Sequence, residues 1–331
     1  VERLPEISYG LRNQRLGDTM LFYKSQSKVG YLDKEFADNL SPSYNAARFD
    51  TFHELSLPKR YFGWLEIVPR FGGRATLYED SPDGEGLSRG IFHAGTEFGT
   101  RMYKTMEVYN DTLDIDRLRH VIEPRIKYTY VNRPSVEKEE IFQFDSIDAI
   151  MKYHAFRFSL RNKLQTKRDE LNWDLVDFLI YSDRYIQEFP EPDRNFSDIF
   201  LNLDFFPVRN IALEFGAAFD QYDEHWDFAV TDLKFYRAEH WSVSFGHRFR
   251  RDESSLATYD INYIFNESLS FAVYQRFEIE TGDLEEQEYT IFRNLHCWDS
   301  SLTYRKLGED KQVFIAFWLR DYDNLPIDIG N

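Results

Sequence analysis

The stretch that decides the fold runs from Arg117 to Val131 and reads R-L-R-H-V-I-E-P-R-I-K-Y-T-Y-V. Taken two residues at a time, it separates into an apolar side and a polar side. The apolar side holds Ile122, Ile126, Tyr128 and Tyr130, and the polar side holds Arg119, Glu123, Arg125, Lys127 and Thr129. A period of two predicts a β-strand, here with lipid on one face and an aqueous lumen on the other. Pro124 gives no ladder donor, so it predicts a bulge or a weakened pairing there.

The composition narrows the class of protein. The chain has 331 residues and a formal net charge of -17, and 17% of its residues are aromatic. The aromatic residues recur in alternating segments between acidic loops, as in the girdles of outer-membrane barrels. The longest purely apolar run, Val313 to Leu319, is too short for a membrane helix, which excludes a helical membrane protein but not a barrel. The acidic balance argues against nucleic acid as a partner.

The second half of the chain predicts a series of strands without helices. They are Ala155 to Thr166, Leu171 to Gln187, Ser197 to Phe206, Asn210 to Asp220, Trp226 to Phe235, Trp241 to Arg250, Leu256 to Phe265, Leu269 to Glu280, Glu288 to Leu295, Ser300 to Leu307 and Gln312 to Arg320. Short connections alternate with longer acidic ones, which predicts an all-β, antiparallel, up-and-down barrel of the outer membrane with roughly sixteen or seventeen strands. Ile211, Leu213 and Phe215 are expected to face lipid and Glu214 the lumen. The alternative is a soluble β-sandwich whose apolar face is its core.

The first half is less regular. Glu2 to Arg12 and Asp18 to Ser27 read as strands, and Val29 to Asn45 reads as a loop. Gly90 to Tyr109 predicts one long strand or a hairpin. A polar excursion follows the Arg117 strand, from Asn132 to Asp148, and a short helix is expected between Ser146 and Lys152.

Several short motifs carry a resemblance to a known family. They are Arg119-His120-Val121-Ile122-Glu123-Pro124 followed by Tyr128, Phe144-Asp145 to Asp148, Leu160-Arg161-Asn162, His296-Cys297-Trp298, the opening Arg3-Leu4-Pro5-Glu6 and the closing Leu325-Pro326-Ile327-Asp328. The chain resembles the C-terminal β-barrel of the lipopolysaccharide-assembly outer-membrane protein, the lipopolysaccharide transport protein D family. His120, Pro124, Asp145, Asp148, Asn162 and Trp298 are the residues that match it.

The resemblance implies an arrangement larger than this chain. Residues 1–331 would form the barrel of a longer exported protein in the outer membrane of a Gram-negative bacterium. A periplasmic N-terminal domain, absent here together with the first strands, would receive lipopolysaccharide from a periplasmic bridge, and a small lipoprotein would plug the lumen. We expect no cofactor, and we expect a translocation channel rather than an enzyme.

Cys297 is the single cysteine, and it lies in a short connection. A lone cysteine in an exported protein indicates a bond to a partner outside the sequence, or a free thiol. The resemblance places that partner in the absent N-terminal domain. A zinc site is not expected, because only His296 stands beside it.

Transport of a charged, acylated lipid suggests two further groups of residues. Arg119, Glu123, Arg125 and Lys127 are candidates for contact with cargo in the lumen, where cations would meet phosphates. Alternatively, they only solvate the interior. The last predicted strand supplies candidates for a lateral seam: Gln312, Phe314, Ala316, Trp318 and Arg320. Acidic connections that contain Asp283, Glu285 and Glu286 would share divalent cations with surface lipopolysaccharide, or are solvated loops.

Other functions stay open at this point. A general diffusion porin or another outer-membrane channel would share the strand pattern. A barrel enzyme would need a catalytic cluster, and Gly86-Leu87-Ser88-Arg89-Gly90 matches the G-x-S-x-G elbow. That elbow requires a strand before it and a helix after it, whereas here it sits in a loop before a predicted strand, so a chance match is favoured.

Overall fold

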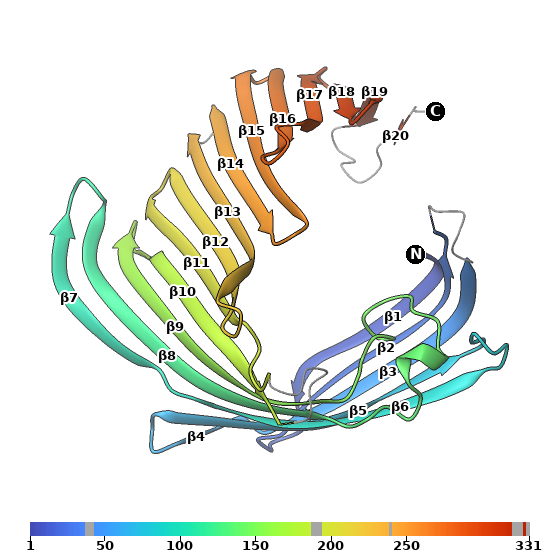
Figure 1. Ribbon diagram of the computed structural model, residues 1–331. Coiled ribbons are helices and arrows are strands. Elements are labelled where there is room, and N and C mark those ends of the chain that lie inside the picture. The colour runs from blue at the N-terminus through green and yellow to red at the C-terminus, as the bar shows by residue number, and fades with distance from the viewer. Residues whose placement is uncertain (37–42, 187–193, 238–239, 320–326, 329–331) are drawn as a thin grey trace. The chain divides into compact units, whose positions relative to one another are not determined.

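The computed structural model describes residues 1–36, 43–186, 194–237, 240–319 and 327–328, and these are almost entirely antiparallel strands (Figure 1). The strands are β1 (Glu2–Arg15), β2 (Phe22–Lys34), β3 (Tyr44–Ser56), β4 (Lys59–Tyr61), β5 (Leu65–Tyr78), β6 (Leu87–Gly99), β7 (Met102–Asn110), β8 (Ile115–Val131), β9 (Tyr153–Arg168), β10 (Leu171–Tyr185), β11 (Ile199–Val208), β12 (Ile211–Asp220), β13 (His225–Arg237), β14 (Trp241–Arg250), β15 (Ser254–Asn266), β16 (Leu269–Glu278), β17 (Leu284–Asn294), β18 (Trp298–Leu307), β19 (Asp310–Leu319) and β20 (Ile327–Asp328). One 3-10 turn, η1 (Lys138–Glu140), accompanies them. In the described ranges, no helix has the length and apolarity needed to cross a membrane.

The strands follow an up-and-down order. From β11 to β19 each strand pairs antiparallel with the next one along the chain. This confirms the predicted all-β, antiparallel, up-and-down class. β4 and β20 are only three and two residues long. If these two are set aside and β6 and β7 are counted as one interrupted strand, seventeen long strands remain of the twenty in the described residues, in agreement with the sequence-based count.

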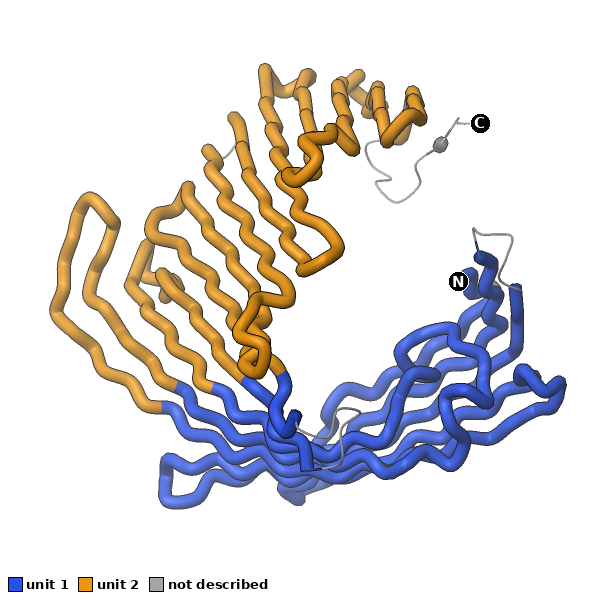
Figure 2. The backbone as a smooth tube through the Cα atoms, in the orientation of Figure 1, with its two compact units in different colours: residues 1–101, 123–159, 182–197 blue, residues 102–122, 160–181, 198–331 orange. Residues whose placement is uncertain are grey.

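The chain divides into two compact units (Figure 2). Unit 1 comprises residues 1–101, 123–159 and 182–197, and unit 2 comprises residues 102–122, 160–181 and 198–331.

Unit 1 presents one polar face and one apolar face. Strand register places Lys28, Asp50, Thr76 and Arg89 in one row across β2, β3, β5 and β6. The next row, on the opposite face, contains Val29, Phe49 and Leu77, which are 46%, 39% and 50% exposed. Neighbouring residues of a strand point to opposite faces, so each row continues the alternation of the sequence.

The prediction of a loop from Val29 to Asn45 is wrong at both ends. β2 continues to Lys34, and β3 starts at Tyr44. Gly30 obscured the strand pattern, although the strand needs it. A Cβ atom at Gly30 would lie 3.0 Å from the carbonyl oxygen of Pro5, so a larger residue would force β1 to shift away by a few tenths of an ångström.

The ladder on β8 is interrupted at Pro124. The second half of β8 pairs with β6, ending at Gly99 and Arg125, and the first half pairs with β7, starting at Met102 and Ile122. Between them the Thr100 amide donates a 3.3 Å hydrogen bond to the Pro124 carbonyl. The predicted weakening is therefore confirmed, but the register is the same on both sides and no bulge occurs. β6 and β7 realise the predicted long strand rather than a hairpin.

The connection between β8 and β9 spans residues 132–152, here called the β8–β9 segment. The helix expected between Ser146 and Lys152 is wrong, because residues 146–149 form a turn and residues 150–152 have no regular structure. The helical turn is η1 instead, where Glu137 and Glu140 form a reciprocal capping box. The Asp148 carboxylate accepts hydrogen bonds from the backbone amides of Phe144 and Asp145. These hydrogen bonds favour a tight turn over a helix.

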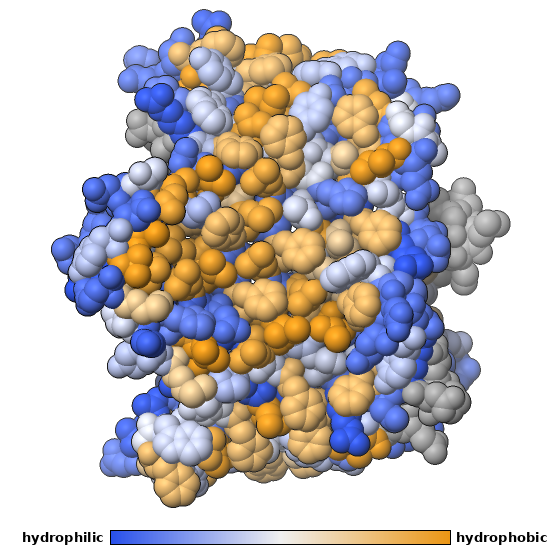
Figure 3. All heavy atoms as spheres, turned by 60° about the vertical axis from the view of Figure 1, so that its left-hand side comes forward, coloured by the Kyte–Doolittle hydropathy of each residue, from blue (hydrophilic) through white to orange (hydrophobic). Residues whose placement is uncertain are grey.

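Unit 2 repeats the two-faced arrangement. An apolar row crosses β14 to β19 through Trp241, Tyr263, Phe271, Ile291, Leu302 and Ile315. The row beside it, on the other face, contains Ser242, Asn262, Ala272, Thr290 and Thr303. Leu213 pairs with Leu233, and Glu214 pairs with Asp232, as the face assignment predicted. Apolar side chains form a broad band on the face shown in Figure 3, with hydrophilic side chains along its margins.

Candidate functional site

The polar face of unit 1 holds a buried ion-pair network. Arg48, on β3, donates from Nη1 to both carboxylate oxygens of Asp148 at 2.8 Å, and from Nη2 to Asp145 at 2.7 Å. The Tyr78 hydroxyl on β5 donates to Asp148 at 2.6 Å. Asp148 also accepts the backbone amides of Phe144 and Asp145, so its charge is fully compensated although its side chain is 0% exposed. This network fixes the β8–β9 segment to the sheet.

A second arginine fastens the same segment. Arg89, on β6, is 2% exposed and donates to the backbone carbonyls of Val136, Ile147, Asp148 and Ile150. Apolar contacts add to this, because Phe144 joins Leu32 and Ala46 in a buried cluster. The segment is therefore a built part of the polar face.

Two residues of the motif, Asp145 and Asp148, meet here, but their partners were missed from sequence. Arg48, Tyr78 and Arg89 all occupy alternating polar-side positions of their strands, and that parity is the only signal that the sequence offers for them.

Asp145 has an altered acidity. Burial alone would raise the pKa of its carboxyl group, but the hydrogen bond from Arg48, the Ile147 amide and the nearby charges of Arg48 and Arg3 outweigh burial. The pKa is therefore below its ordinary value. Asp145 stays ionised at neutral pH and holds the network together.

The lumen candidates Glu123, Arg125 and Lys127 differ in their surroundings. Arg125 lies 2.6 Å from Glu97 and 3.6 Å from Glu123, and Glu123 lies 3.0 Å from Arg101. These charges largely neutralise one another. Lys127 is exposed, and within the described residues no carboxylate lies within ion-pair distance of its ammonium group. Among these three residues, Lys127 is thus the cation whose charge is not paired.

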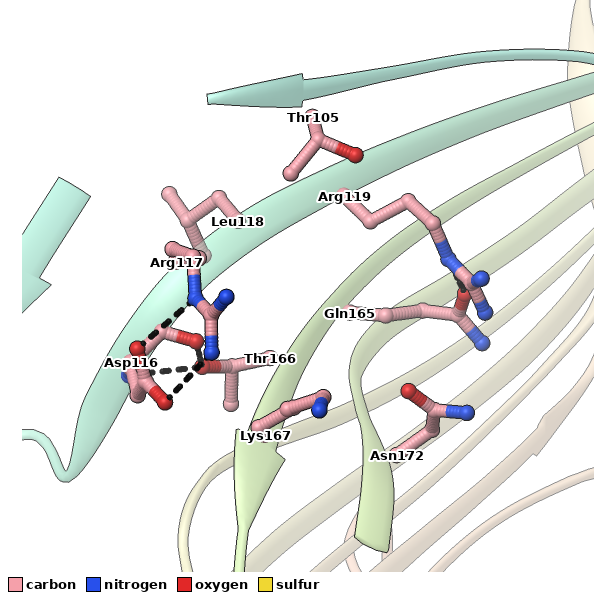
Figure 4. Close-up of a pocket in the computed structure, with 9 residues that line it drawn as sticks. All are labelled: Thr105, Asp116, Arg117, Leu118, Arg119, Gln165, Thr166, Lys167 and Asn172. Atoms are coloured by element: carbon pink, nitrogen blue, oxygen red, sulfur yellow. Dashed lines mark hydrogen bonds and ion pairs between the residues drawn. The ribbon is translucent and has the colours of Figure 1, made fainter. Parts of the chain in front are cut away.

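Arg119, the fourth lumen candidate, lies in unit 2 and lines a pocket of about 150 Å³ (Figure 4). Its Nε donates to Gln165 Oε1 at 2.8 Å. The other lining residues are Thr105, Asp116, Arg117, Leu118, Thr166, Lys167 and Asn172. The pocket is bounded by the ends of β7, β8, β9 and β10 that adjoin short turns.

Arg168 is a further residue that sequence reasoning missed. Its side chain is 1% exposed, and it donates to the carbonyls of Leu113 and Pro207 at 2.8 and 2.7 Å. It therefore ties the β7–β8 turn to the end of β11. Arg209 pairs with Asp114 and Asp169 beside it, and the hydrogen bond from Arg209 lowers the pKa of Asp169.

The remaining motif residues occupy separate places. His120 Nε2 and Asn162 Oδ1 are 3.3 Å apart, so the structure brings these two together on β8 and β9. Trp298 opens β18 opposite Leu319 and is 41% exposed. Cys297 is an exposed free thiol in the short connection before Trp298.

The predicted seam strand corresponds to β19. Gln312, Phe314, Ala316 and Trp318 share one face, opposite Arg305, Thr303, Ser301 and Asp299 of β18. Arg320 lies outside the described residues. On its other side β19 pairs with β20 at only two positions among the described residues, Ala316 and Phe317.

Of the three predicted acidic residues, Glu285 and Glu286 have defined partners, whereas Asp283 lies just before β17. Glu285 and Glu286 belong to β17 rather than to a loop, and Arg276 lies 3.0 and 3.1 Å from them. They are thus not solvated loop carboxylates.

Two groups of described residues have the spacing of metal ligands. The donor atoms within each group lie within 4.8 Å of one another; the groups are Asp220, Asp223 and His225, and Asp198, Asp220 and Asp227. Ser88 continues into β6 rather than into a helix, so the elbow geometry is absent at this position.

Comparisons with known proteins give one family. The family model described as LptD, LPS transport system D, matches residues 1–279. No curated protein matches the chain. Among solved structures, a mutant of the Rh. blastica porin is 9% identical with a TM-score of 0.37, covering 90% of this chain and 98% of that chain. A structure described as "Asymmetric conductivity of engineered proteins" is also 9% identical, with a TM-score of 0.36, and covers 95% of this chain and 98% of that chain.

Proposed function

The chain belongs to the LptD family, LPS transport system D, and on this premise we propose that it inserts lipopolysaccharide into the outer leaflet through a polar lumen and a lateral seam. The family consists of outer-membrane β-barrel transport proteins and is not an enzyme family. Lipopolysaccharide transport and an outer-membrane location therefore hold for this chain at the level of the family.

The observation that carries the finer proposal is the separation of the two faces. In each unit, apolar rows face one side of its sheet and rows of paired charges face the other. Lipopolysaccharide has a phosphorylated sugar end and several acyl chains. A polar lumen that contains Arg125 and Lys127 would hold the sugar end, while the acyl chains leave sideways into the bilayer.

The seam is proposed at β19. A lateral exit requires that ladder hydrogen bonds open, and the free energy needed rises with each buried bond that is lost. Among the described residues, β19 is fully paired with β18 but pairs on its other side at two positions. The second side is therefore the edge where the barrier to opening would be lowest.

Partners outside the chain complete the proposal. A periplasmic domain of a longer protein would receive cargo from the periplasmic bridge, and a lipoprotein plug would occupy the lumen. The exposed Cys297 thiol, on a short connection, would form a disulfide with that periplasmic domain. No cofactor is required.

The proposal is tested by photocrosslinking in cells. A photoreactive residue replaces Arg125 or Lys127 in the full-length protein, and adducts are detected by blotting for lipopolysaccharide. Ile211, on the apolar face of β12, is the matched control. Light-dependent adducts at the polar positions only are expected. If the barrel is folded and no adduct forms, while purified protein conducts small solutes across a bilayer without any lipoprotein, the general diffusion porin is correct instead.

A further inference from the structure

The pocket around Arg119 combines three cationic side chains with one carboxylate. Arg117, Arg119 and Lys167 line it, and Asp116 is the single acidic lining residue. Asp116 is already engaged, because Arg117 Nε and Nη2 donate to its two oxygens at 3.0 and 3.1 Å. The charge of Asp116 is thus balanced by Arg117, and Arg119 and Lys167 give the pocket lining an excess of positive charge.

Arg119 is held in place by a buried amide. Gln165 is 8% exposed, and its Oε1 accepts the Arg119 Nε at 2.8 Å while its Nε2 donates to Asp174 at 2.5 Å. Asp174 therefore fixes which way the Gln165 amide points, and Gln165 fixes the guanidinium. In the described residues no carboxylate reaches the two terminal nitrogens of Arg119, which remain as fixed donors at the pocket (Figure 4).

Lys167 is the movable cation of the pocket. Its side chain is 44% exposed, and among the described residues its ion-pair partner is Glu170 at 4.0 Å, itself 95% exposed. Such an exposed pair is held weakly and exchanges readily for a better anion. The Asn172 amide and the Thr105 hydroxyl complete the lining with neutral polar groups.

From this geometry we propose that the Arg119 pocket binds a phosphate group of a lipid. A preorganised guanidinium group and a mobile ammonium group can together donate hydrogen bonds to several oxygens of a tetrahedral phosphate. The volume of about 150 Å³ equals that of an engineered cavity that holds benzene, so one tetrahedral phosphate fits.

The position of the pocket gives it a role in transport, a step that rests on the proposed function. It lies at the strand ends next to the short turns of β7–β8 and β9–β10, residues 111–114 and 169–170. In an outer-membrane barrel the short turns are periplasmic. The pocket would then capture a phosphate of lipopolysaccharide where cargo arrives, before it reaches the row that contains Lys127.

Binding is measured with the full-length protein in detergent. The probes are lipid A that carries its phosphates, the same lipid A with the phosphates removed, and phosphatidylglycerol. The variants are Lys167→Gln and the double variant Arg119→Gln with Lys167→Gln. Lys104→Gln is the matched control, because Lys104 is an exposed lysine next to Thr105 but on the other face of β7.

Wild type and the control are expected to bind phosphorylated lipid A about tenfold or more tightly than the dephosphorylated form. Lys167→Gln should reduce that preference several-fold, and the double variant should abolish it. Lys167→Gln breaks only an exposed contact, so a loss of folding does not confuse its result. If the variants weaken phosphatidylglycerol binding as much as lipid A binding, the pocket binds lipid phosphates in general. If they leave phosphatidylglycerol binding unchanged, the pocket is specific for lipid A.

A phosphate preference that survives in both variants overturns the inference. This outcome is distinct from failure of the proposed function, which is read in cells at Arg125 and Lys127. If no adducts form in cells, but the wild-type protein prefers phosphorylated lipid A and the variants lose that preference, translocation is refuted and the pocket is still a phosphate site. If adducts form in cells, but the variants keep the preference for phosphorylated lipid A, translocation is supported and the pocket is not a phosphate site.

Discussion

Arg48 Nη1 lies 2.8 Å from each carboxylate oxygen of Asp148, and the two side chains are 3% and 0% exposed. A carboxylate as deeply buried as that of Asp148 needs a cationic partner, because its desolvation would otherwise be uncompensated. The pair joins β3 to a residue one hundred positions later in the chain. It therefore determines whether the β8–β9 segment stays on the polar face.

Removing one partner of this pair should release the segment. Arg48→Met leaves the buried carboxylate of Asp148 without its cationic partner, which costs about 3–5 kcal/mol. We expect hydrogen–deuterium exchange of residues 132–152 to rise strongly, while the strands of unit 2 keep their protection. Arg133→Gln is the control, because its side chain is 76% exposed and its partner Glu137 is local. Unchanged protection of the segment in Arg48→Met would contradict the anchoring role.

Acid should loosen the same segment through Asp145. A carboxyl group whose pKa is lowered on folding stabilises the folded state above its ordinary pKa of 3.8 and loses that contribution as the pH falls through the lower folded value. Exchange of residues 132–152, corrected for its intrinsic pH dependence, should be constant from pH 7 to about 5 and increase only below about 4. Asp145→Asn should remove this acid response. A midpoint above pH 5 would exclude Asp145 as its cause.

Two adjacent glycines on β5 should differ sharply in their tolerance of a methyl group. A Cβ at Gly72 would lie 2.1 Å from the His53 carbonyl oxygen and 2.9 Å from the Glu54 Cα, whereas at Gly73 the nearest atom is 3.4 Å away. Gly72→Ala should destabilise the protein by about 1–3 kcal/mol or prevent assembly. Gly73→Ala should change stability by less than about 0.5 kcal/mol. Thermal unfolding in detergent measures both, and equal unfolding temperatures would contradict the close approach of β3 to β5.

Lys127 should affect cargo without affecting stability. Its exposed ammonium group has no carboxylate within ion-pair distance in the described residues, so the neutral variant Lys127→Gln should shift the unfolding free energy by no more than about 0.5 kcal/mol. Adducts of lipopolysaccharide at a photoreactive residue in place of Thr129, on the same face, should fall several-fold. Lys59→Gln, on the β4 hairpin, is the control. Undiminished adducts would show that Lys127 does not meet cargo.

The exposed thiol of Cys297 should be oxidised in the envelope of the cell. Full-length protein extracted with thiols blocked should migrate differently on gels with and without reductant, and Cys297→Ser should remove the difference. If Cys297 instead reacts in intact cells with a membrane-impermeant or periplasmic thiol reagent in full yield, it is a free thiol and no disulfide exists.

Periodicity predicted the faces correctly because it is a local property. The alternation of Arg119, Glu123, Arg125 and Lys127 with Ile122, Ile126 and Tyr128 survives unchanged in β8. The same rule failed where a strand contains glycine, at Gly30, because the missing side chain interrupts the pattern that close packing requires.

The buried network was not predictable in this way. Asp145 and Asp148 stood out as part of a motif, but nothing near them in sequence names Arg48 or Arg89. Their contacts arise because the β8–β9 segment folds back over the polar face, and a fold-back of that kind depends on the summed bonds of distant side chains. The Arg119 pocket was not predicted for a similar reason, because Gln165 of β9 orients the Arg119 side chain of β8.

The interruption at Pro124 carries a consequence for the evolution of the chain. Gly99 faces Arg125 and Met102 faces Ile122, so the ladder resumes in step after a gap of two residues on each strand. Loss or gain of a single residue on one strand would put the charged side chains of half of β8 where tyrosines and isoleucines now stand. Homologous chains should therefore vary in length here only by matched changes on both strands or by two residues at a time.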